Sequence, residues 1–153
     1  MPSAPPTTEP AVTRTPAAET AFCFERTPGR PGTYPAPSDR LWVGQVRRIT
    51  ETRLRYWGLE RLQDDAGLLV SELLTNALLY GSGTAVHVRI SCARDEVRLA
   101  VRSGPACTDR VRVCEAGPSD ESGRGLLLVA ALTETWGVDR EGWVWCKLPV
   151  PAV

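Results

Sequence analysis

Residues 70–81, with the sequence VSELLTNALLYG, constrain the fold of this chain more than any other stretch. In a helix, Glu72 and Asn76 lie one turn apart on the same face. The apolar positions Ala66, Val70, Leu73, Leu74 and Ala77 form a stripe roughly opposite them. A carboxylate can move a proton and an amide oxygen can hold a hydrated Mg²⁺. By spacing alone, however, such a pair is more often a solvated surface feature.

Length and charge restrict the class of protein. The chain has 153 residues, which is enough for one domain with its own core. Its 18 basic and 18 acidic residues cancel, whereas a nucleic-acid partner normally requires a basic excess. No secretory signal opens the sequence, and the longest apolar run, residues 126–132, is too short to span a membrane. We therefore expect a cytoplasmic protein that binds neither nucleic acid nor membrane.

The cysteines do not form a recognisable framework. There are five of them, and no two form a C-x-x-C pair: Cys23, Cys92, Cys107, Cys114 and Cys146. This pattern indicates neither a zinc site nor a disulfide scaffold. We expect free thiols in a reducing compartment.

The first 37 residues differ in composition from the rest. They contain nine of the 13 prolines, so we expect a mostly disordered arm. Its aromatic residues predict a short edge strand within 21–26. From residue 38 to 150 the pattern is that of one folded domain.

Two helices are predicted in this domain. Ser38 or Asp39 can cap the first, which runs to about Trp57 and ends at Gly58. The second begins between residues 61 and 64 and continues to Tyr80, where the Gly-Ser-Gly sequence of residues 81–83 ends it.

Four strands are predicted after the helices. Residues 84–92 and 96–102 alternate apolar and polar side chains, which indicates one buried and one wet face. His87, the only histidine, lies on the wet face and is most simply a surface residue. Residues 135–138 and 143–148 form the last two strands.

An irregular segment, residues 103–122, separates the two pairs of strands. Loops of this length inside a domain tend to be lids or binding loops. The sequence Glu-Ser-Gly-Arg-Gly at 121–125 follows, and the apolar run at 126–132 begins directly after it. Glycines before a helix suit an anion such as phosphate, although a flexible loop entering a core helix explains them equally well.

Taken together, the two motifs resemble those of the GHKL (Bergerat-fold) ATPase/kinase superfamily. Residues 72–77 (ELLTNA) are similar to its N box, and residues 121–129 (ESGRGLLLV) to its glycine box. Within the superfamily, the chain is most similar over residues 38–149 to the small, single-domain anti-sigma-factor serine/threonine kinases of actinobacterial type. The resemblance implies a two-layer α/β sandwich, with a mixed sheet covered on one face by helices.

The resemblance also implies roles for particular residues. Glu72 would be the general base, Asn76 would coordinate Mg²⁺, and Gly123, Arg124, Gly125 and Leu126 would bind the phosphates of ATP. Members of this family bind a sigma factor, phosphorylate an antagonist protein and commonly form homodimers.

Two positions depart from the family pattern, both on the adenine side. Ser103 stands where the family has an aspartate that accepts a hydrogen bond from adenine, and a neutral acceptor gives a weaker bond. Trp143 stands where a threonine is common, and it could fill part of the base pocket. Two hypotheses therefore remain: an ATP-dependent kinase, or a binding module with weak or no ATP binding. A detached sensor histidine-kinase domain is a weaker third possibility, because no helix with a phosphoacceptor histidine precedes the domain.

Overall fold

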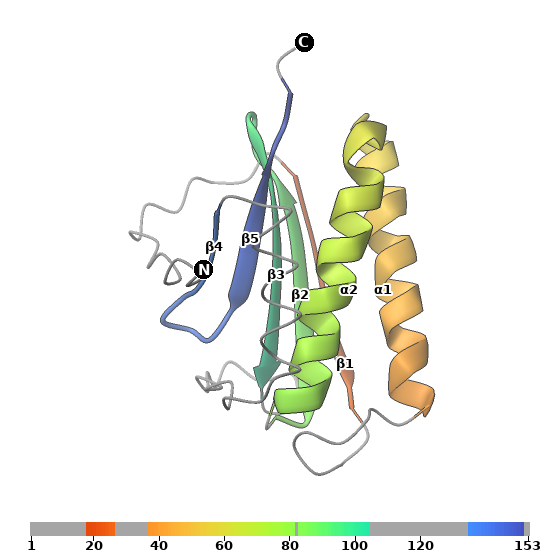
Figure 1. The fold of residues 1–153 in the computed structure, drawn as a ribbon, viewed down its shortest axis with the longest axis vertical. Helices are drawn as coiled ribbons and strands as arrows, with labels where there is room; N and C mark the ends of the chain where they lie inside the picture. The colour runs from red at the N-terminus through yellow and green to blue at the C-terminus, as the bar shows by residue number, and fades with distance from the viewer. Residues whose placement is uncertain (1–17, 27–36, 82, 105–134, 152–153) are drawn as a thin grey trace, which may run out of the picture.

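Two long helices cover one face of a five-stranded sheet in the computed structural model of the chain (Figure 1). The structure describes residues 18–26, 37–81, 83–104 and 135–151. The strands are β1 (Ala18–Glu25), β2 (Ala85–Cys92), β3 (Glu96–Gly104), β4 (Thr135–Val138) and β5 (Val144–Pro149). The helices are α1 (Pro37–Tyr56) and α2 (Gln63–Tyr80), joined through a 3₁₀ turn at Glu60–Leu62. The two-layer α/β architecture expected from the sequence is confirmed.

The sheet has the strand order β1-β2-β3-β5-β4, and each of these neighbouring pairs is antiparallel. The expectation of a mixed sheet is therefore wrong for the described strands. The reason lies in the connections. The hairpins β2–β3 and β4–β5 reverse the chain, and β5 lies between β3 and β4, antiparallel to both.

The end of α1 follows the sequence closely. Gly58 has a φ of +75°, which favours glycine, and it terminates the helix as expected. The amide of Leu59 donates to the carbonyl of Leu54 at 2.8 Å, and the amide of Gly58 donates to that of Arg55 at 3.0 Å. This is the Schellman arrangement. At the other end, Ser38 and Asp39 lie within the first turn of α1 rather than before it.

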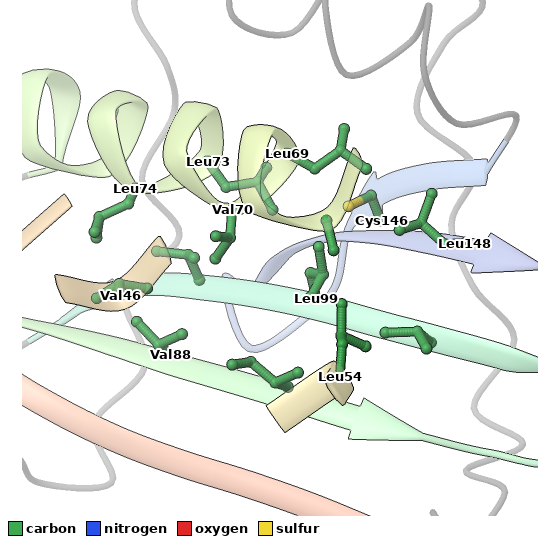
Figure 2. Packing of buried hydrophobic residues seen from close by; sticks show 14 of the residues in the cluster. Val46, Leu54, Leu69, Val70, Leu73, Leu74, Val88, Leu99, Cys146 and Leu148 are labelled. Carbon is green, nitrogen blue, oxygen red and sulfur yellow. The ribbon is translucent and has the colours of Figure 1, made fainter. Parts of the chain in front are cut away.

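The main core lies between α2 and the sheet. Leu69, Val70 and Leu73 of α2 point toward the strands, where Leu99 of β3 and Cys146 of β5 are buried (Figure 2). Burying each such side chain contributes roughly 1.5–3 kcal/mol. The apolar stripe predicted for this helix is confirmed at four of its five positions, namely Ala66, Val70, Leu73 and Leu74.

The opposite face of the sheet is only partly exposed, contrary to the expectation of a wet face. Trp143 and Trp145 are only 5% and 1% exposed there, and with Ala100 they form a second buried cluster. Cationic groups lie over both rings: Arg89 and Arg102 at 4.6 and 4.8 Å from the Trp143 centroid, and Arg98 and Lys147 at 5.2 and 5.3 Å from that of Trp145. Arginine and lysine stems can cover apolar surface while their charges attract the ring faces.

Strand β1 forms one edge of the sheet, next to β2. It begins at Ala18, earlier than the aromatic signal at 21–26 indicates. Phe24 stacks on Trp42 of α1, with ring centroids 4.4 Å apart and planes inclined by 10°. The strand is therefore fastened to the helix layer as well as to β2.

Cys23 of β1 is in a disulfide bond, which corrects the expectation of five free thiols. Cys92 and Cys146 are free. Sequence spacing does not predict this bond, because bridging depends on distance in the fold. No helix among the described residues combines the length and the hydropathy needed to cross a membrane.

Candidate functional site

Helix α2 presents Glu72 and Asn76 from the side that the core leaves open. Both residues are half-buried, one turn apart, while Leu73 and Leu74 between them are buried in the core. The pair therefore lies at the margin of the core, as its spacing predicts. The carboxylate and the amide are therefore only partly exposed to solvent.

The amide oxygen of Asn76 has an unusual environment. Its Oδ1 atom is buried and has no hydrogen-bond partner among the residues that the structure describes. Leaving a buried acceptor unsatisfied costs about 1–3 kcal/mol, so such an atom in a folded protein calls for an explanation. An oxygen that can only accept suits a donor or a hard cation, and Mg²⁺ takes oxygen ligands from one or two protein groups together with substrate phosphates and water. Asn76 therefore fits the metal-binding role that the sequence predicts.

Ser103, the last residue but one of β3, lies at the C-terminal end of α2. Its side chain shares a face with that of Val86 across the strand pair, toward the helices, as its alternation with Val101 predicts. Ser103 is 5% exposed, and its Oγ accepts a hydrogen bond from the amide of Gly83 at 3.2 Å. Asn76 and Ser103 thus both belong to the end of the molecule where α2 and β3 terminate (Figure 1).

Gly81 and Gly83 make this close approach possible. A Cβ atom at Gly81 would collide with Ser103 Oγ and with the carbonyl of Ala77, and one at Gly83 would collide with the backbone of Gly104. The sequence identified these glycines as the end of a helix. It gave no signal that their main role is to let the helix end pack against β3.

Arg26 is a further residue at this end of α2, and sequence analysis did not find it. Its guanidinium donates to three main-chain carbonyls: Nη1 to Gly81 at 2.6 Å and to Ala77 at 3.2 Å, and Nη2 to Leu78 at 2.5 Å. Local sequence holds no signal for this contact, since Arg26 precedes its acceptors by more than fifty positions.

Trp143 lies away from this site, which corrects the expectation that it fills part of a base pocket. It packs with Ala100 and Trp145 on the face of the sheet opposite the helices, and His87 contacts it edge-on with centroids 6.3 Å apart. The pleat explains this position, because Trp143 has the same parity as Trp145, whereas Val144 and Cys146 face the helices.

The residues predicted to bind phosphate, Gly123, Arg124, Gly125 and Leu126, lie outside the described part of the chain. Their roles stay predictions. The described residues place Glu72 and Asn76 on α2 and Ser103 beside the C-terminal end of that helix, and they separate all three from Trp143.

One comparison with known proteins bears on this arrangement. The family model of the histidine kinase-like ATPase domain matches residues 36–144, a span that contains α1, α2, Ser103 and the glycine-rich segment at 121–125. No curated protein matches the chain.

Proposed function

The chain belongs to the family of histidine kinase-like ATPase domains, and on that premise we propose that it is an anti-sigma-factor-type regulatory kinase of the cytoplasm. It binds ATP with Mg²⁺, phosphorylates a serine or threonine of an antagonist protein, and sequesters a sigma factor. Homodimer formation is part of the same proposal. The unpartnered Oδ1 of Asn76, one helical turn after Glu72, is the observation that carries it.

Each residue has a chemical task in this proposal. Asn76 would offer its amide oxygen to Mg²⁺. Glu72 would accept the proton of the substrate hydroxyl while the hydroxyl oxygen bonds to the γ-phosphorus of ATP, and the bond between that phosphorus and ADP breaks so that ADP leaves. A bound magnesium ion would supply positive charge against the phosphate oxygens. Phosphoryl transfer depends mainly on positioning and charge stabilisation, so a weaker contact to the base need not abolish it.

In this proposal, residues 123–126 bind the phosphates of ATP. Main-chain amides near Gly123 and Gly125 and the guanidinium of Arg124 are suitable donors to phosphate oxygens.

A matched pair of measurements tests the kinase proposal. We expect calorimetric titration with Mg·ATP to give similar dissociation constants, below millimolar, for the wild type and for Glu72→Gln, because the amide keeps the shape of the carboxylate. Transfer of labelled phosphate from ATP to purified antagonist proteins of anti-sigma systems should occur with the wild type only. Absence of heat from the wild type at millimolar Mg·ATP would rule the kinase out.

A second candidate function rests on Ser103. A neutral hydroxyl, already accepting from Gly83, replaces the family's carboxylate, and the missing charge-assisted bond weakens base binding by roughly 1–3 kcal/mol. The chain would then be a binding module that regulates through protein contact alone.

Ser103→Asp separates the two functions, with Ser103→Asn as its uncharged control. Strong ATP binding by the aspartate variant, and none by the wild type or by Ser103→Asn, would favour the binding module. Tight binding by the wild type would exclude it. Because Ser103 is packed against Gly81, each variant is compared with the wild type by thermal unfolding before titration.

A further inference from the structure

The N-terminal strand is connected directly to the end of α2 through one side chain. We propose that Arg26 is a positioning residue for the nucleotide site, which holds the last turn of α2 and thereby sets the position of Asn76. Docking of β1 and binding of Mg·ATP should then favour each other. The second half of this inference rests on the function proposed above, whereas the first half does not.

The contact is suited to fixing a helix end. The last four carbonyls of a helix lack partners within the helix and carry its partial negative charge. The last turn of α2 has no basic residue of its own. Arg26 supplies the cation from outside, and its planar fork reaches the carbonyls of Ala77, Leu78 and Gly81 at once.

The position of this contact connects it with the site. Ala77, one of the acceptors, is the residue after Asn76, so we expect a shift of this part of the helix to move the Asn76 side chain as well. The amide of Arg26 also donates to the carbonyl of Thr84 at 2.9 Å, just beyond the turn that follows α2. Ser103 and Gly104 pack against the same turn. The end of α2 is therefore held between the end of β1 and the end of β3.

Strand β1 pairs with β2 alone, because it lies at an edge of the sheet. Besides its pairing with β2, the strand is attached in further ways: Glu19 pairs with Arg89 at 2.9 Å, Phe24 stacks on Trp42, and Cys23 is in a disulfide bond. If β1 leaves β2, Arg26 leaves with it and the end of α2 loses its cap. If docking of β1 strengthens ligand binding at Asn76, then ligand binding must strengthen docking of β1 by the same factor, because coupling between two equilibria is reciprocal.

Three variants of the full chain test the proposal. Arg26→Gln removes the charge and the fork, and Arg26→Lys keeps the charge but not the fork. Glu19→Gln is the matched control, because it breaks an exposed ion pair of β1 that has no contact with α2. The readouts are hydrogen exchange at residues 78–81, the NMR shift of the Asn76 side-chain amide, and ATP affinity with Mg²⁺ and with EDTA.

We expect Arg26→Gln to speed exchange at 78–81, to move the Asn76 resonance, and to weaken Mg·ATP binding about three- to tenfold. Affinity in EDTA should change less than twofold, since the effect acts through the metal ligand. Arg26→Lys should lie between Arg26→Gln and the wild type, and Glu19→Gln should match the wild type. Mg·ATP should also slow exchange within β1 of the wild type.

Unchanged exchange at 78–81 and an unmoved Asn76 resonance in Arg26→Gln would overturn the proposal. So would an equal loss of affinity with Mg²⁺ and with EDTA, because that result is expected of general destabilisation. Should Arg26→Gln not fold, the same criteria apply to Arg26→Lys. If the wild type binds no nucleotide, the proposed function fails, and the exchange and NMR results still decide whether Arg26 positions Asn76.

Discussion

Gly81 and Ser103 lie so close together that a β-carbon on Gly81 would collide with the Ser103 hydroxyl oxygen. The contact sets how the end of α2 lies on the end of β3. Because Asn76 is just over one turn before Gly81, the same contact helps to fix the position of the candidate metal ligand. Backbone strain is not involved, since Gly81 has an ordinary φ of −69°.

We predict that Gly81→Ala destabilises the protein by about 1–3 kcal/mol, because the added methyl group overpacks the junction of α2 and β3. Gly44→Ala in α1 is the control, as no atom in the described part of the chain lies within 4 Å of its added methyl group. In an exposed helix interior that change should stabilise by about 0.5–1 kcal/mol. Urea unfolding measures both. Equal effects of the two substitutions would show that Gly81 is not closely packed.

Trp143→Phe should leave ATP affinity within about twofold of the wild type, since the residue lies on the face opposite α2. It should lower stability by about 1–2 kcal/mol through weaker contacts with Arg89 and Arg102. Calorimetric titration measures the ATP affinity, and thermal unfolding measures the stability. A tenfold change in ATP affinity would contradict this placement and indicate that Trp143 lies in the base pocket.

Cys146 gives the protein a dependence on alkaline pH. Burial raises the pKa of its thiol from 9.0 to about 12, with Arg98 lowering it in part. The unfolded thiol ionises first, so the folded state binds more protons between these values and stability falls as the pH rises through them. The unfolding free energy should therefore fall less in Cys146→Val than in the wild type between about pH 8 and 10.

Cys92→Ala serves as the control for this effect. Burial raises the pKa of the Cys92 thiol too, but the residue is only partly buried. This variant should keep most of the wild-type pH dependence. Identical slopes for the wild type and Cys146→Val would contradict the assignment.

Asn76→Ala should leave the stability of the nucleotide-free protein unchanged or raise it by up to about 2 kcal/mol. The substitution removes a buried acceptor that has no partner, and alanine favours a helix more than asparagine does. Chemical unfolding without nucleotide tests this. A loss of more than 1 kcal/mol, on the order of one ordinary hydrogen bond, would mean that the Asn76 amide is structural.

Local patterns predicted most of the elements because each depends on neighbouring residues. The apolar stripe at Ala66, Val70, Leu73 and Leu74 predicted α2, and Gly58 predicted the end of α1. The pair Glu72 and Asn76 followed from helical spacing alone. Alternation likewise placed Ser103 on the helix side of β3.

The features that could not be predicted depend on contacts between distant segments. Arg26 contacts the end of α2, which lies more than fifty residues later in the sequence. Gly81 must be a glycine only because β3 packs against it in the folded protein. Alternation in β2 and β3 predicted two different faces. It could not distinguish a wet face from one on which cationic groups lie over the buried rings of Trp143 and Trp145. The antiparallel sheet arises from the insertion of β5 beside β3, for which the sequence has no local signal.

The magnesium dependence of ATP binding at Asn76 tests the central claim most directly. Calorimetric titrations of the wild type and Asn76→Ala would be made with ATP in excess Mg²⁺ and in EDTA. The account predicts that Mg²⁺ tightens binding to the wild type by about tenfold or more, roughly 1.4 kcal/mol, and that Asn76→Ala loses this gain while its affinity in EDTA is unchanged. A wild-type gain from Mg²⁺ that Asn76→Ala fully retains would contradict it.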